Sequence, residues 1–200
     1  MKSLVTVMIA LTLAPACSHA DAYVIKRGDQ ANQVVFRSTA TLESFEGKTR
    51  EVWGRLDANL ANLSAGLTVH VEVDLASLDT GISLRNRHMR ENHLHTDKYP
   101  LAVFHAAEIL DAPPGGLAFA QKTKLRLKGD FTLHGVTLPI EIPVEVERLT
   151  AEDGERLVVT SQFEIKLPDF AIPRPKFLLL KLSDVQTISV KLVLRPEVRQ

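Results

Sequence analysis

The chain has 200 residues, in which 24 lysines and arginines balance 24 aspartates and glutamates, and it contains a single cysteine, Cys17. A net charge of zero gives no electrostatic reason to expect nucleic acid as a partner. A lone cysteine also excludes a disulfide within the chain and a metal site built from several thiolates, so an apolar core must hold the fold.

The first twenty residues are typical of a secretory signal peptide. Lys2 precedes an apolar run over residues 4–13, and the small residues Ser18 and Ala20 occupy the two positions that signal peptidase reads. The apolar run is too short to span a bilayer as a mature helix. We therefore expect cleavage after Ala20, a periplasmic or secreted protein with no stable membrane insertion, and one domain over residues 21–200.

Apolar and polar residues alternate with a period of two through most of the remaining chain. Val69, Val71 and Val73, for example, alternate with polar neighbours, which places the three valines on one face of a strand. The same pattern, or a short apolar run between turn residues, predicts further strands on both sides. In chain order the expected strands are 22–26, 34–41, 52–60, 69–73, 101–110, 117–120, 124–134, 140–147, 157–167 and 188–194.

Turn signals separate these strands, among them Gly28-Asp29, His134-Gly135 and Asp153-Gly154. Strands with one apolar and one polar face at this spacing indicate an all-β antiparallel sandwich or barrel. Long amphipathic strands with few prolines to protect their edges favour closure, because a closed barrel has no free edge. The sequence thus predicts an extended antiparallel β-barrel of about eight strands.

The alternation stops between Leu84 and Leu94, where good helix formers appear. The Asp79-Thr80-Gly81 turn precedes this stretch and Tyr99-Pro100 follows it, which predicts a short helical insertion near residues 84–94. On a barrel, such an insertion lies over a rim or over one open end.

Three histidines, His88, His93 and His95, lie in or beside this insertion. A metal or haem site is one interpretation, but side chains two apart on a helix point in different directions. Arg87 and Arg90 would also repel a cation. We therefore predict no metal site and interpret the histidines as solvated loop residues, with a metal- or haem-binding protein as the alternative.

Motifs for catalysis are missing from the sequence. It contains no Gly-x-Ser-x-Gly elbow, no His-Glu-x-x-His motif, no glycine-rich phosphate loop and no dinucleotide fingerprint, and cleavage after Ala20 would remove Cys17. We predict a protein without catalytic residues or cofactors.

Four segments resemble the YceI-like family of exported lipid- or polyisoprenoid-binding proteins. They are SLDTG at 77–81, RNRHMR at 85–90, YPLAVF at 99–104 and GDFTLHGVTLP at 129–139. The resemblance covers essentially the whole mature chain. It implies a lipocalin-like barrel with an apolar cavity for an isoprenoid-like lipid of the polyprenyl or quinone type, and it gives no oligomeric state.

Within that resemblance, the apolar face of each expected strand suggests the cavity lining, and the insertion suggests a polar contact. If the insertion covers the barrel end, Arg87, His88 and Arg90 could meet a phosphate, quinone or other head group. A lipid-modifying enzyme on the same scaffold is a further alternative. The expected ligand-binding residues are Phe36, Leu56, Val71, Phe104, Phe131, Ile142, Phe163 and Leu192.

Overall fold

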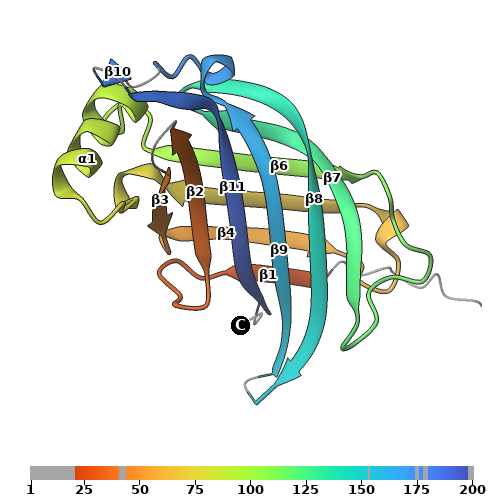
Figure 1. Ribbon diagram of the computed structural model, residues 1–200. Coiled ribbons are helices and arrows are strands. Elements are labelled where there is room, and N and C mark those ends of the chain that lie inside the picture. The colour runs from red at the N-terminus through yellow and green to blue at the C-terminus, as the bar shows by residue number, and fades with distance from the viewer. Residues whose placement is uncertain (1–20, 41–43, 153, 174–175, 178–179, 198–200) are drawn as a thin grey trace, which may run out of the picture.

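The computed structural model describes residues 21–40, 44–152, 154–173, 176–177 and 180–197. Eight antiparallel strands form a closed barrel in the order β1-β4-β5-β6-β7-β8-β9-β11, because β11 pairs back with β1 (Figure 1). The barrel strands are β1 (Asp21–Ile25), β4 (Val52–Ala58), β5 (Leu67–Asp74), β6 (Leu101–Ile109), β7 (Lys122–Leu133), β8 (Val136–Ala151), β9 (Gly154–Lys166) and β11 (Leu180–Pro196).

The long strand β11 is shared between two partners on one of its edges. Its C-terminal residues pair with β1, whereas residues 182–191 pair with β2 (Gln33–Ala40). β2 in turn pairs with β3 (Ser44–Thr49), and the short β10 (Lys176–Phe177) pairs with the start of β11. At one end the barrel is thus extended by a β2–β3 hairpin, which lies beside β11 in Figure 1.

The helical elements gather mainly at the end that carries this hairpin. After β5, the chain forms a 3-10 turn η2 (Leu75–Ser77), helix α1 (Ser83–His88) and a π-helical turn η3 (Met89–Leu94). We call α1 and η3 together the cap. Two further 3-10 turns are η4 (Leu167–Phe170), which follows β9, and η1 (Leu63–Ala65), which joins β4 to β5. None of the helices in the described residues has the length and apolarity required to cross a bilayer.

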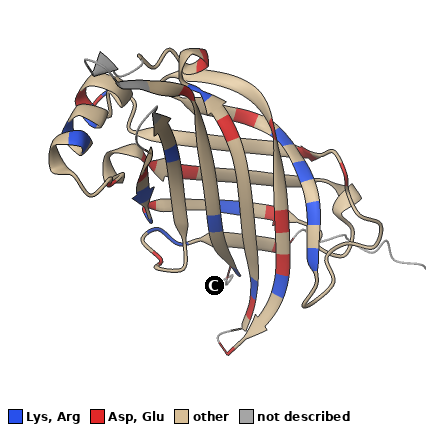
Figure 2. Ribbon diagram, in the orientation of Figure 1, with Lys and Arg blue, Asp and Glu red and all other residues tan. Residues whose placement is uncertain are grey.

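Alternation places apolar side chains inside and charged side chains outside. On β7, Leu125 and Leu127 are buried, whereas Lys124 and Arg126, which alternate with them, are exposed. Figure 2 shows the outer charges as blue bands on β7 beside red bands on β8. Cross-strand pairs such as Lys122–Glu145, at 2.8 Å, join the two series.

The all-β barrel with a short helical insertion, predicted from the sequence, is confirmed. The expected strand at 117–120 is wrong, because only Phe119 forms an isolated bridge there while Leu117 is buried in the core. Conversely, β3 was not expected, since Gly47 interrupts its alternation. The expected signal peptide at residues 1–20 lies outside the described residues, as do residue 41 of an expected strand and residue 153 of an expected turn.

Gly129 allows close approach of β6 and β7 beside a register shift between Ala106 and Glu108. A Cβ at this position would lie 2.3 Å from the backbone oxygen of His105. We expect Gly129→Ala to lower the free energy of unfolding by about 2 kcal/mol or more, because backbone must move to relieve the clash. Chemical denaturation measures the change.

Lys124→Ala, an exposed substitution on the same strand, is the control and should change the unfolding free energy by less than about 0.5 kcal/mol. Equal stability of the Gly129 and Lys124 variants would contradict this account of the strand contact.

Candidate functional site

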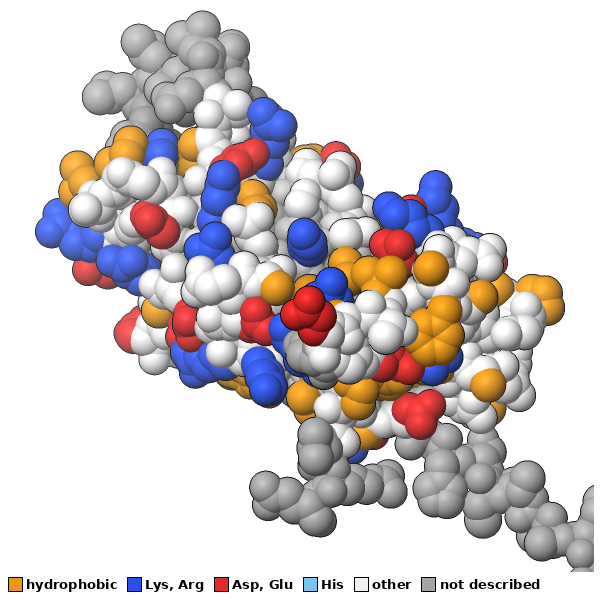
Figure 3. Space-filling view, turned by 90° about the horizontal axis from the view of Figure 1, so that it is seen from below, with side chains coloured by type: hydrophobic (Ala, Val, Ile, Leu, Met, Phe, Trp, Pro, Cys, Tyr) orange, Lys and Arg blue, Asp and Glu red, His pale blue; other side chains and the backbone are white. Residues whose placement is uncertain are grey.

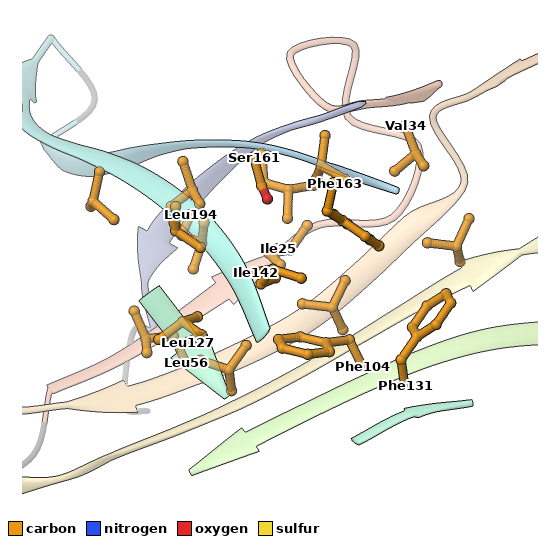
Figure 4. Close-up of a pocket in the computed structure, with 18 of the residues that line it drawn as sticks. Ile25, Val34, Leu56, Phe104, Leu127, Phe131, Ile142, Ser161, Phe163 and Leu194 are labelled. Carbon is orange, nitrogen blue, oxygen red and sulfur yellow. The ribbon is translucent and has the colours of Figure 1, made fainter. Parts of the chain in front are cut away.

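The barrel encloses an apolar cavity of about 210 Å³, which we call the barrel cavity. Inward-facing residues from all eight barrel strands and from β2 line it, as Figure 4 shows for side chains such as Leu56, Phe104 and Phe163 that point into a common space. Among the described lining residues, the two with polar side chains are Arg55 and Ser161. The wall is therefore suited to hydrocarbon.

Both polar lining residues are engaged by the protein itself. The hydroxyl of Ser161 donates a hydrogen bond to the backbone oxygen of Pro143 at 2.7 Å. The Arg55 guanidinium donates to Asp57, with Nε at 2.7 Å from Oδ2, and to Glu197 at 2.6 Å. These bonds reduce the cost of placing polar groups beside an apolar cavity.

Two loops close the end of the barrel opposite the cap. Leu60 and Leu63 come from the β4–β5 loop and Leu117 from the β6–β7 loop, and all three are buried and line the cavity. The Leu117 N–H donates to the Leu60 oxygen at 2.8 Å, which joins the loops. Gly116 permits this contact, since a Cβ there would lie 2.2 Å from the same oxygen. These residues form the floor of the cavity.

A second space of about 380 Å³, which we call the cap pocket, lies beneath α1 and η3. It adjoins the barrel cavity, because the same six residues contribute to both walls. These shared residues are Phe36, Leu75, Leu78, Leu133, Ile165 and Ile188. The two spaces together run from the floor to the cap.

The cap pocket reaches the surface beside exposed apolar side chains. Ile82 is 50% exposed and Leu84 53% exposed, and both line this pocket. Figure 3 shows hydrophobic side chains next to Lys and Arg at the left end of the molecule, which carries α1 in Figure 1. An apolar entrance at this end would let a nonpolar guest enter without crossing a polar barrier.

The cap is anchored by side chains of the SLDTG and RNRHMR segments. Asp79 Oδ1 accepts hydrogen bonds from the Gly81 N–H at 2.8 Å and from Asn86 Nδ2 at 2.6 Å. These bonds hold the pKa of the Asp79 carboxyl below its usual range. Arg85 donates from Nε to the Thr80 hydroxyl at 2.9 Å and lies over the ring of Phe45, 4.4 Å from its centre.

Two histidine contacts join the cap region to the segment after β9. His93 Nδ1 lies 3.0 Å from the Pro173 oxygen, and His134 Nδ1 lies 3.0 Å from the Phe170 oxygen. Because a carbonyl only accepts, each Nδ1 carries the proton. In neutral His134, Nε2 then accepts from His95 Nδ1 at 2.8 Å. These histidines hold the cap in place.

All eight residues expected to bind a ligand line the barrel cavity. Phe131, Ile142 and Leu192 are buried to 8%, 7% and 5% exposure, and the others are partly buried against the same core. Their contact with a guest stays a prediction.

The three expected head-group residues do not lie together at the pocket. His88 lines the cap pocket, Arg87 is exposed, and neither Arg87 nor Arg90 belongs to the wall of either described cavity. Arg85, two residues earlier, does line the cap pocket. Which arginine faces the pocket depends on how the helix is rotated about its own axis, and the sequence alone did not determine that rotation.

The metal-binding alternative finds no support in the geometry. In the part of the chain that the structure describes, no group of three or more His, Cys, Asp or Glu side chains is placed to hold an ion. His93 and His95 instead direct Nδ1 to Pro173 and His134.

Comparison with known proteins places this barrel in a family. The model of the YceI-like domain matches residues 23–194. The chain belongs to the YceI-like family. It is 32% identical over 177 residues to a UPF0312 protein of Vibrio campbellii, covering 86% of this chain and 89% of that protein. A UPF0312 protein of Photorhabdus laumondii is 33% identical over 105 residues, covering 51% of this chain and 50% of that protein.

Solved structures share the fold of this family member. A polyisoprenoid-binding domain from Saccharophagus degradans, implicated in plant cell wall breakdown, superposes with a TM-score of 0.67 at 21% identity, covering 89% of this chain and 99% of that one. BcnA of Burkholderia cenocepacia gives a TM-score of 0.65 at 21% identity, with 81% and 95% covered. The YceI protein of Campylobacter jejuni gives 0.60 at 21% identity, with 76% and 85% covered.

Two buried polar residues of the cap pocket, Ser38 and Gln186, were not expected from the sequence. The sequence nevertheless places them on inward faces, because side chains two residues apart on a strand point the same way. Ser38 lies two residues after Phe36 on β2, and Gln186 lies two residues before Ile188 on β11; Phe36 and Ile188 are apolar lining residues.

The pKa of His93 lies below its ordinary value of 6.5, chiefly because burial penalises the charged ring and also because His88 and His95 are near. As the pH falls through 6.5, the unfolded chain therefore takes up this proton before the native protein does. We expect the free energy of unfolding to decrease as the pH is lowered through 6.5, and His93→Gln to make this decrease shallower.

Denaturation of both proteins at each pH measures the slope. Lys98→Gln, an exposed change close to the cap, is the control and should leave the slope unchanged. A His93 variant with the slope of the unsubstituted protein would show that this ring does not contribute.

Proposed function

We propose that this protein carries an isoprenoid-like lipid of the polyprenyl or quinone type in its barrel cavity. The single observation that supports the proposal is an apolar wall that continues from the floor, past Phe36 and Ile188, into the cap pocket. A continuous apolar path of this kind fits an extended hydrocarbon chain better than a compact polar metabolite.

Burial of the tail supplies the affinity. Each CH₂ group removed from water contributes about 0.8 kcal/mol, so ten such groups contribute about 8 kcal/mol before ordering costs. Phe131 and Phe163 both line the barrel cavity. Their phenyl rings pack edge to face with centres 6.1 Å apart, which stabilises this part of the wall.

The polyisoprenoid-binding domain from Saccharophagus degradans has the same fold, which supports the same ligand class for this chain. The role that we propose is binding without covalent chemistry. Among the described residues that line the barrel cavity there is no His, Asp or Glu to activate Ser161, whose hydroxyl donates to Pro143.

We also propose that the protein is exported and acts in the periplasm or outside the cell. Lys2, the apolar run over 4–13 and Ala20 support this location. Mass spectrometry of the protein purified from its native cell should then show a mature N-terminus at Asp21. A cytoplasmic protein that retains residues 1–20 would contradict the proposal.

Filling the barrel cavity should prevent lipid binding. We expect Val71→Trp, which places a large side chain from β5 into the cavity, to reduce the lipid that co-purifies with the protein by about tenfold or more. Native mass spectrometry and solvent extraction measure the bound lipid.

Thr68→Trp is the matched control, because Thr68 lies on the same strand with its side chain exposed, and it should retain the lipid. Circular dichroism establishes that both variants fold. Purification of the unsubstituted protein without any long apolar molecule, together with failure to bind an added isoprenoid, would contradict the carrier function.

A further inference from the structure

Ser38 and Gln186 form a polar pair within the otherwise largely apolar wall of the cap pocket. Ser38 on β2 is directly opposite Gln186 on β11 in the strand register. Ser38 is 3% exposed and Gln186 is 5% exposed, and both line the pocket. Two buried polar side chains side by side require an explanation, because each loses its hydration.

The register shows that this pair is isolated among apolar residues. One row across β3, β2, β11 and β9 consists of Phe45, Ser38, Gln186 and Ile165, all of which line the cap pocket. The next row toward the floor includes Phe36, Ile188 and Phe163. The polar pair therefore lies one step above the junction between the two cavities.

The chain provides a partner for only part of this pair. Gln186 Nε2 donates to the Ser183 oxygen at 2.8 Å. Within the described residues, neither the Ser38 hydroxyl nor Gln186 Oε1 has a hydrogen-bond partner. Among the described residues, the buried side-chain atoms that lack both a partner and accessible surface are Arg148 Nε and Arg156 Nε, so Ser38 Oγ and Gln186 Oε1 keep some accessible surface.

An irregular segment of β11 holds the side chain of Gln186 in position. The pairing of β11 with β2 shifts register between Leu182 and Gln186. Within this irregular segment, Ser183 accepts the Gln186 amide through its carbonyl and the Val185 N–H through its hydroxyl, at 2.8 Å and 3.0 Å. The remaining Oε1 is therefore held in a defined position before any guest arrives, as is common for bulges beside binding sites.

We propose that Ser38 and Gln186 form a subsite for an uncharged hydroxyl or carbonyl group on the bound lipid; this rests on the proposed lipid-carrier function. The Ser38 hydroxyl donates to the lipid oxygen, and Gln186 Oε1 accepts the proton of a lipid hydroxyl. The tail then extends past Phe36 and Ile188 into the barrel cavity.

The charge of the surroundings selects a neutral group. The row that contains the pair has no charged side chain. Arg85 lies over the neighbouring Phe45 ring and donates to the side chain and the backbone oxygen of Thr80. Arg85, His88 and His93 also line the cap pocket, but the four residues of the row itself offer a phosphate no opposite charge, so its desolvation there is costly.

Three probes with the same C15 tail test the subsite: farnesol, farnesyl diphosphate and the hydrocarbon farnesene. Displacement of a fluorescent apolar probe measures each affinity. The unsubstituted protein should bind farnesol about tenfold more tightly than farnesene, from two added hydrogen bonds, and more tightly than the diphosphate. The double variant Ser38→Ala/Gln186→Leu should lose the preference for farnesol while its affinity for farnesene is retained.

The outer face of the same sheet supplies a matched control. Ser189 on β11 is opposite Gln162 on β9, which makes a second serine–glutamine pair. Ser189 lies between two inward-facing residues of β11, so its own side chain points outward. Ser189→Ala/Gln162→Leu should keep the preference for farnesol. Ser38→Ala alone, which removes one oxygen atom, should lower that preference severalfold and serves if the double variant does not fold.

Equal binding of farnesol and farnesene by the unsubstituted protein would overturn the subsite alone. Tighter binding of the diphosphate than of farnesol would overturn the choice of a neutral group. Failure of all three probes to bind would overturn the carrier function itself, and the subsite with it.

Discussion

An antiparallel sheet with one apolar face has to remove both that face and its open edges from water, and the pairing of β11 does both. One edge of β11 pairs with β9, and the other is divided between β2 and β1. The β1 contact closes the barrel near the floor. At the cap end β3 pairs instead with the loop after η2, where Lys48 and Asp79 exchange two backbone hydrogen bonds of 2.9 Å. Closure by two different partners leaves the interior continuous from floor to cap.

The same loop determines where the cap lies. Asp79 pairs with β3 through its backbone and holds Gly81 and Asn86 through its carboxylate. One residue therefore couples the position of the β2–β3 hairpin to the start of α1. On the other side, His93 and the His95–His134 pair attach the cap region to the segment after β9. The entrance is thus bounded by elements whose positions depend on one another.

Two serines in the cavity walls show how the protein separates a hydrocarbon region from a polar one. Ser161 donates to Pro143, whereas Ser38 has no partner among the described residues and faces the cap pocket beside Gln186. An unpaired hydroxyl in the barrel cavity would penalise an apolar tail, but in the cap pocket it can meet the polar end of a lipid. This arrangement orients a guest that has one polar end.

By itself the sequence determined the barrel, the faces of most strands and the place of the insertion, because a period of two fixes which side chains face inward whatever the partners are. Val71 and Phe131 could therefore be assigned to the interior before any pairing was known. Tertiary structure alone decided the rest. Which arginine of the cap faces the pocket depends on helical phase, and the meeting of Ser38 with Gln186 depends on a register between strands almost 150 residues apart in sequence. Contacts of that kind come from strand pairing across the whole chain, which local alternation does not encode.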